Sequence, residues 1–178
     1  MCWAAHELEL DRLIVVPAGD PWQKTAQVPV TSPDIRLRLA EAMVGSLVSP
    51  DSDLPCRIEV SDVEVRRSGP SYMVDTLIEL DLGLPFLVLG ADSAASLRSW
   101  HRCGEVASRC VIAWGARPGV EEPEFAADWT HCRFDLPALE LDSTSIRRWA
   151  RDGRPLSGLV PDEVVSILDA QGLYRVDR

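Results

Sequence analysis

The sequence has few features of a membrane, secreted or nucleic-acid-binding protein. No apolar run approaches the roughly 20 residues that span a bilayer, and the first residues, Met1 to Glu7, have neither the basic region nor the apolar stretch of a signal peptide. Acidic residues outnumber basic ones by 28 to 18, which gives a net charge of −10. This balance argues against a nucleic-acid partner, because DNA and RNA binders need a basic face. We therefore expect a cytoplasmic protein with neither a membrane nor a nucleic-acid partner.

Cysteine pairs at metal-binding spacing are also lacking. The five cysteines stand at irregular spacings, and no Cys-x-x-Cys occurs. Reduced thiols are the simpler interpretation, and we predict no protein-held metal site. With 46% hydrophobic residues in a chain of 178, there is enough apolar material for one domain with a substantial core.

Short apolar runs alternate with helical patterns along the chain. The runs are rich in aliphatic residues on both faces, which favours parallel strands covered by helices on each side. The three clearest runs lie at residues 12–17, 86–89 and 110–113. Val60, Val63 and Val65 indicate a further strand, with a local irregularity.

Helix signals lie between the apolar runs. Ser32-Pro33 offers an N-cap followed by proline at the first helical position, and Asp142 or Ser143 can cap a later helix that Gly153 closes. Strand and helix alternate as in a doubly wound, Rossmann-like α/β domain with helices on both faces of a parallel sheet. We expect helices over 2–10, from Ser32-Pro33, over 75–80, over 93–106 with a break near Gly104, from Asp142 to Gly153 and over 161–171.

Polar residues follow the first apolar runs, where a doubly wound sheet binds its ligands. After the run 12–17, two prolines and Gly19 shape a loop that ends at Lys24, the only lysine, whose ammonium suits a phosphate. After the run 86–89, Gly90 lets a ligand approach the backbone, and Asp92 suits ribose hydroxyls. An ordinary surface loop and a plain helix cap remain the alternatives for these two segments.

A turn and an aromatic residue suit a flat, acidic ligand. After Gly69-Pro70, free backbone amides near Ser71 and Tyr72 can bind a carboxylate at the start of a helix, although a plain capped turn is equally consistent. Trp100 can stack on a heteroaromatic ring or pack in the core.

The later helix start suits a phosphate chain. Ser143, Thr144 and Arg147 offer hydroxyls, helix amides and a guanidinium. Taken alone, this segment is an ordinary helix-capping pattern. Together with the loops at three strand ends, it predicts a nucleotide site.

Taken in order, these segments resemble the bacterial nicotinate-mononucleotide adenylyltransferases of the nucleotidyltransferase superfamily. The similarity runs from the first helix to Tyr174. The matching pieces are PAGDPWQK, Ser32-Pro33 to Arg36, VSDVEVRRSGPSYMVDTL, LGADSAASLRSW, ARPG, DSTSIR and GLVPDEVV.

The resemblance implies transfer of AMP from ATP to nicotinate mononucleotide, with Mg²⁺ on the phosphates and no covalent enzyme intermediate. It places Lys24 near the substrate phosphates. For the mononucleotide it implies Ser71, Tyr72, Met73, Asp75, Trp100 and Arg117; for ATP it implies Gly90, Asp92, Ser143, Thr144 and Arg147.

The family opens with a strand and a His-x-Gly-His motif, and none of the three histidines here stands in that setting. From this comparison we expect one domain over 1–178 that lacks the usual first strand, through a late start assignment or a truncated gene. Two alternatives stay open: a catalytically silent nucleotide-binding relative, and an adenylyltransferase for another pyridine mononucleotide. Assembly into a homo-oligomer also stays open.

Overall fold

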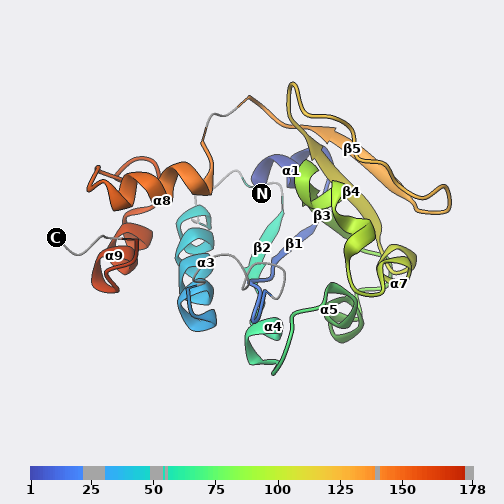
Figure 1. The fold of residues 1–178 in the computed structure, drawn as a ribbon, viewed down its shortest axis with the longest axis horizontal. Helices are drawn as coiled ribbons and strands as arrows, with labels where there is room; N and C mark the ends of the chain where they lie inside the picture. The colour runs from blue at the N-terminus through green and yellow to red at the C-terminus, as the bar shows by residue number, and fades with distance from the viewer. Residues whose placement is uncertain (22–30, 49–53, 55, 139–140, 175–178) are drawn as a thin grey trace.

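The computed structural model describes residues 1–21, 31–48, 54, 56–138 and 141–174 (Figure 1). Strands and helices alternate along most of this length. In chain order the elements are α1 (Cys2–Glu7), β1 (Arg12–Val15), α3 (Pro33–Leu47), β2 (Arg57–Val60), α4 (Val63–Arg66), α5 (Met73–Leu80), β3 (Phe86–Gly90), α6 (Ala91–Ala95), the 3-10 helix η1 (Leu97–Ser99), α7 (Cys103–Ser108), β4 (Val111–Ala116), β5 (His131–Asp135), α8 (Ser143–Arg151) and α9 (Asp162–Ala170).

The strands pair in parallel, as expected, but they form two sheets instead of one. β1 pairs with β2, with Arg12 opposite Arg57. The second sheet has the order β3-β4-β5, with Phe86 opposite Val111. The α/β class with a parallel arrangement is therefore confirmed, whereas the single continuous sheet is not, because β1 and β3 share no ladder among the described strands.

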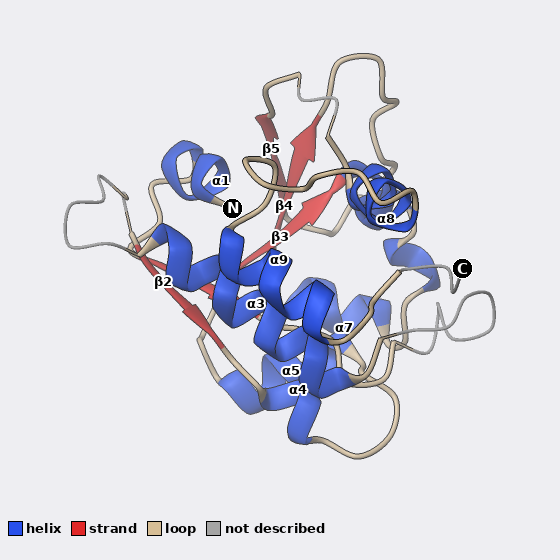
Figure 2. Cartoon of the chain, turned by 90° about the vertical axis from the view of Figure 1, so that its left-hand side faces the viewer, coloured by secondary structure: helices blue, strands red, loops and turns tan. Residues whose placement is uncertain are grey.

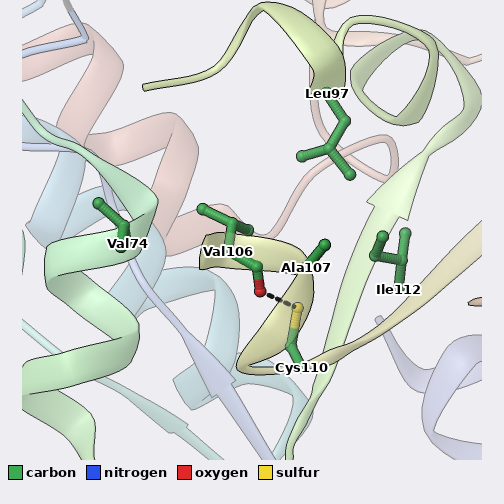
Figure 3. Close-up of a cluster of buried hydrophobic side chains, with 6 residues drawn as sticks. All are labelled: Val74, Leu97, Val106, Ala107, Cys110 and Ile112. Carbon is green, nitrogen blue, oxygen red and sulfur yellow. Dashed lines mark hydrogen bonds between the residues drawn. The ribbon is translucent and has the colours of Figure 1, made fainter. Parts of the chain in front are cut away.

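β4 lies at the centre of a three-layered region. Consecutive residues of this strand, Ile112 and Ala113, are both fully buried. Ile112 packs with Val106 of α7 in a cluster on one face (Figure 3), and Ala113 packs with Ala4 of α1 on the other. Successive strand residues point to opposite faces, so helices cover both sides of this sheet, and the continuous apolar run of β4 follows from that.

A second core lies away from the β3-β4-β5 sheet. α3 and α9 pack side by side (Figure 2), and Ala42 of α3 shares a buried cluster with Val164 and Ile167 of α9. Trp149 of α8 packs against the same cluster. This cluster holds the carboxyl-terminal helices against α3, which in turn lies on β2.

Local capping signals predicted helix starts accurately. The Ser32 hydroxyl accepts a bond from the Ile35 amide at 3.4 Å, and α3 begins at Pro33. The Asp142 carboxylate accepts one from the Ser145 amide at 2.6 Å at the start of α8. Within the described residues, no helix is long and apolar enough to cross a membrane.

Three expectations about local structure were wrong or incomplete. Val63 and Val65 are helical in α4, where Val63 is buried and Arg66 pairs with Asp62 at 3.1 Å, so the strand ends at Val60. The expected helix 93–106 is interrupted before α7, and Gly104 lies inside α7. The chain turns instead at Arg102, whose φ is +53°. β5 was not predicted, because its alternating polar and apolar residues lack the continuous apolar run of β3 and β4.

Candidate active site

A cavity of about 270 Å³ lies where the carboxyl ends of β1 and β3 converge. Its walls come from the loop after β1, the start of α5 and the segment after β3. This is the edge of a parallel sheet at which α/β domains bind ligands. The lining residues are Val16, Ala18, Pro21, Glu64, Ser71, Tyr72, Met73, Ser93, Trp100 and His101.

The loop after β1 is held tightly against the segment before α5. Gly19 approaches Glu64 so closely that an added Cβ would lie 2.0 Å from its carbonyl oxygen. The Ser71 hydroxyl accepts bonds from the amides of Gly19 and Asp20, at 2.9 and 3.0 Å, and the Ser71 amide donates to the Asp20 carbonyl at 2.9 Å. The Ser71 side chain, expected to bind substrate, therefore positions this wall of the cavity.

Arg36 fixes the same loop from α3. Its guanidinium donates to the Ala18 carbonyl at 2.5 and 3.1 Å, to the Gly19 carbonyl at 2.5 Å, and to the Thr31 carbonyl. Burial lowers the pKa of Arg36, and the charge of Asp20 partly offsets this. The sequence analysis included Arg36 in a matching segment but gave it no role. Its partners lie 17 and 18 residues earlier, so no local spacing indicates them.

Aromatic rings form the opposite wall. Tyr72 and His101 stack with ring centroids 4.1 Å apart and planes 26° from parallel. Trp100 lies beside them, and its indole Nε1 donates to the Ser96 hydroxyl at 3.3 Å. Flat π surfaces of this kind accept a planar heteroaromatic ring. His101 is a cavity residue that the sequence analysis missed, because nothing around it marks a histidine motif.

A buried polar network supports the floor. Glu64 is only 4% exposed, and its carboxylate accepts a bond from the Thr76 hydroxyl at 2.6 Å. Arg67 donates to the same hydroxyl at 3.2 Å and pairs with Glu79 at 2.5 Å. Because every member has a partner, the network holds the start of α5 in one position.

The cavity collects only part of the predicted site. Ser71, Tyr72, Met73 and Trp100 line it, and Asp75, two residues after Met73 in α5, pairs with Arg102 at 3.6 Å. Gly90 ends β3 and Asp92 is exposed at the start of α6; both lie at the same sheet edge but outside the lining. Lys24 lies outside the described residues.

The remaining predicted residues lie further from the cavity. Arg117 is exposed in the turn after β4. Ser143 and Thr144 are exposed at the start of α8, and Arg147 donates to the Thr144 hydroxyl at 3.4 Å. The bond from the Ser145 amide holds the pKa of Asp142 below its usual value. The described cavity is therefore lined by four of the predicted mononucleotide residues, whereas Asp75, Arg117 and the predicted phosphate residues of α8 lie outside its lining.

Known proteins of similar sequence agree on one family. The chain is 33% identical to a probable nicotinate-nucleotide adenylyltransferase of Desulfitobacterium hafniense, over 97% of this chain and 86% of the relative. It is 34% identical to a protein of the same description from Corynebacterium kroppenstedtii, over 96% and 80%. No family model matches the chain.

Solved structures of similar fold have the same description. The nicotinic acid mononucleotide adenylyltransferase of Plasmodium falciparum, solved in complex with NaAD, matches with a TM-score of 0.67 at 15% identity, over 93% of this chain and 83% of that one. A protein of Vibrio parahaemolyticus matches with a TM-score of 0.59 at 19% identity, over 98% and 86%. The fold is thus that of a nucleotidyltransferase. The chain belongs to the nicotinate-nucleotide adenylyltransferase family.

Proposed function

We propose that this protein transfers the adenylyl group of ATP to nicotinate mononucleotide. A phosphate oxygen of the mononucleotide attacks the α-phosphorus of ATP, the bond to the β-phosphate bridging oxygen breaks, and pyrophosphate leaves. The observation that carries the proposal is the aromatic cavity at the carboxyl ends of β1 and β3, in a chain of this family.

The cavity provides the chemistry that a pyridine carboxylate requires. α5 begins at its wall without a side-chain cap from any described residue, so the Met73 amide can donate to the carboxylate and the helix dipole favours its charge. Trp100 stacks on the pyridine ring, with Tyr72 beside it. Ser71 and Asp75 position this wall, through the β1 loop and Arg102 respectively.

The adenosine and phosphate contacts extend along the same sheet edge. In this proposal Gly90, at the end of β3, and Asp92, at the start of α6, contact the adenosine, and Lys24 and Arg117 supply cations for the phosphates. The exposed start of α8 suits the ATP phosphates, because free helix amides and a guanidinium both favour anions. The residues proposed there are Ser143, Thr144 and Arg147.

Mg²⁺ enters this reaction as a companion of ATP. No group of three His, Cys, Asp or Glu side chains that could hold a metal ion occurs within the described part of the chain. Mg²⁺ commonly keeps several waters and binds through substrate phosphates. When bound, the ion neutralises charge on the phosphates, and the chain's own residues orient the two substrates.

The direct test measures pyrophosphate release by the purified chain with Mg²⁺, ATP and nicotinate mononucleotide. We expect turnover that falls strongly when the amide mononucleotide replaces the acid, because backbone donors suit a carboxylate. Faster turnover with the amide would overturn the substrate assignment. Binding of nicotinate mononucleotide without any pyrophosphate release would show a catalytically silent relative.

A matched pair of variants tests the cavity itself. Trp100→Ala removes the stacking surface. Trp3→Ala removes a different indole, on α1. The Trp3 residue is 46% exposed, and its indole donates to the Asp135 carbonyl at 2.7 Å. We expect only the first variant to weaken mononucleotide binding, measured by calorimetric titration. Equal affinities in the two folded variants would count against the cavity.

A further inference from the structure

Glu64 is a buried carboxylate beside a cavity that is proposed to bind another carboxylate. It lines the 270 Å³ cavity and is only 4% exposed. Of the described residues in that lining, it is the only one whose side chain ends in a carboxylate. Like charges that approach closely in a region of low dielectric constant oppose each other. Binding of a pyridine carboxylate therefore requires that the charge of Glu64 is offset from elsewhere in the fold.

The hydroxyl of Thr76 connects Glu64 to the start of α5. Thr76 is 1% exposed; its hydroxyl donates to the Glu64 carboxylate at 2.6 Å and lies 3.3 Å from the Tyr72 carbonyl oxygen. The Tyr72 carbonyl and the Met73 amide belong to the same peptide group. The charge of Glu64 is therefore two short contacts away from the peptide group whose N–H is proposed to bind the substrate carboxylate.

Arg67 is the cation that reaches the same hydroxyl. Its guanidinium donates to the Thr76 hydroxyl oxygen at 3.2 Å and pairs with Glu79 at 2.5 Å. The Arg67 side chain is 19% exposed and that of Glu79 is 51% exposed, so water screens the carboxylate more than the cation. A hydroxyl that accepts from a guanidinium is a stronger donor to a carboxylate, because hydrogen bonds in a chain polarise one another. Through Thr76, Arg67 therefore offsets the charge of Glu64.

The other arginines near the start of α5 have different partners. Arg102 pairs with Asp75 at 3.6 Å. Arg66, the residue before Arg67, has a side chain that is 70% exposed and pairs with a carboxylate four residues earlier. Among the described residues, Arg67 is thus the arginine that hydrogen bonds connect to Glu64.

We propose that Arg67 determines the preference of the cavity for the acid over the amide mononucleotide. It lies outside the described lining of the cavity, so it acts through Thr76 as a positioning residue. With Arg67 in place, the charge of Glu64 is offset and the Met73 amide binds the carboxylate. Without Arg67, the charge of Glu64 repels a carboxylate and leaves a neutral carboxamide unaffected. The inference rests on the proposed function, because it concerns the substrate named there.

The test is a double-mutant cycle on the full chain. Isothermal titration gives the Kd of nicotinate mononucleotide and of nicotinamide mononucleotide for the parent, Arg67→Gln, Glu64→Gln and the double variant. We expect Arg67→Gln to weaken binding of the acid by about tenfold or more and binding of the amide by less than about twofold. Adding Glu64→Gln should return the acid to within about threefold of the parent, because glutamine keeps an acceptor for Thr76 and removes the charge.

Two further variants separate charge from structure. Arg67→Lys keeps the cation, and its affinity for the acid should fall by no more than about threefold. Arg66→Gln makes the same change of charge one residue earlier and should leave the ratio of the two affinities unchanged. The thermal midpoint of each variant shows whether it folds. A loss of acid affinity of about tenfold in folded Arg67→Lys would overturn the proposal independently of the glutamine variant.

A merely structural role would give a different pattern. Equal losses for the acid and the amide in Arg67→Gln, or no recovery in the double variant, would overturn the proposal. A parent that prefers the acid in titrations but releases no pyrophosphate would contradict the transfer reaction, and the cycle would still decide this inference. A parent that releases pyrophosphate, with the same acid preference in Arg67→Gln, would contradict this inference alone. A parent that binds neither mononucleotide would contradict both.

Discussion

Gly19→Ala tests whether the close approach of the β1 loop to α4 shapes the candidate site. The added Cβ would lie 2.0 Å from the Glu64 carbonyl oxygen and 3.3 Å from the Ser71 hydroxyl oxygen, and ordinary contact begins near 3.4 Å. The backbone must therefore move by about 1.4 Å, which is the difference between the 3.4 Å contact distance and the 2.0 Å separation of the added Cβ from the Glu64 oxygen. This shift pulls the loop away from the Ser71 hydroxyl and the Arg36 guanidinium.

The expected cost is that of an overpacked site, about 1–3 kcal/mol in the free energy of unfolding. At about 2–4 °C per kcal/mol for a chain of this size, the Tm should fall by roughly 2–12 °C. Gly45→Ala is the control, because Gly45 lies inside α3 with no atom within 4 Å of an added Cβ. It should raise stability by about 0.5–1 kcal/mol. Scanning calorimetry measures both. A Gly19→Ala protein with the parental Tm and mononucleotide affinity would refute the reasoning.

Four further outcomes follow from the site and the core. Trp100→Ala should weaken nicotinate mononucleotide binding by about 1–3 kcal/mol, the scale of base stacking on aromatic rings, in a titration where an unchanged Kd refutes stacking. Arg147→Ala should weaken ATP binding more than mononucleotide binding, and equal losses in parallel titrations would argue against its phosphate role. Burial raises the pKa of Cys110 to about 11, so mass spectrometry should find it unlabelled by iodoacetamide at pH 8 until the chain unfolds; rapid native labelling would contradict its burial. The lowered pKa of Asp142 means that its stabilising contribution is present above the unfolded value near 3.9 and is lost as pH falls through the folded value. Denaturant titrations should therefore show the difference between parent and Asp142→Asn shrinking below about pH 4, and a difference that stays constant with pH would contradict the lowered pKa.

Much of the local structure could be predicted, because its determinants lie within a few residues. The Ser32 and Asp142 caps each bond to an amide three residues later, so the sequence pattern contains both partners. The apolar runs of β3 and β4 indicated strands buried on both faces. β5 gave no such signal, and Val63 and Val65 favoured a strand by residue type until contacts around α4 made them helical.

Half of the candidate site could be predicted in the same way, since Tyr72, Met73 and Trp100 follow recognisable turns and strands. The other half depends on partners far apart in the chain. Ser71 reaches back 52 residues to Gly19, and His101 meets Tyr72 across 29 positions of sequence. A hydroxyl or an imidazole has the same local appearance whether it binds substrate, positions a loop or stacks on a ring.

The sequence by itself determined the family, the parallel α/β class and the places where helices begin, because these depend on residue order and short-range hydrogen bonds. Only the tertiary structure decided that β1 and β3 stand apart with a cavity between them, that Arg36 clamps the β1 loop, and that α8 lies outside the aromatic cavity. The physical reason is that strand pairing and loop packing join residues distant in sequence, and their free energy depends on which edges and faces the whole chain brings together.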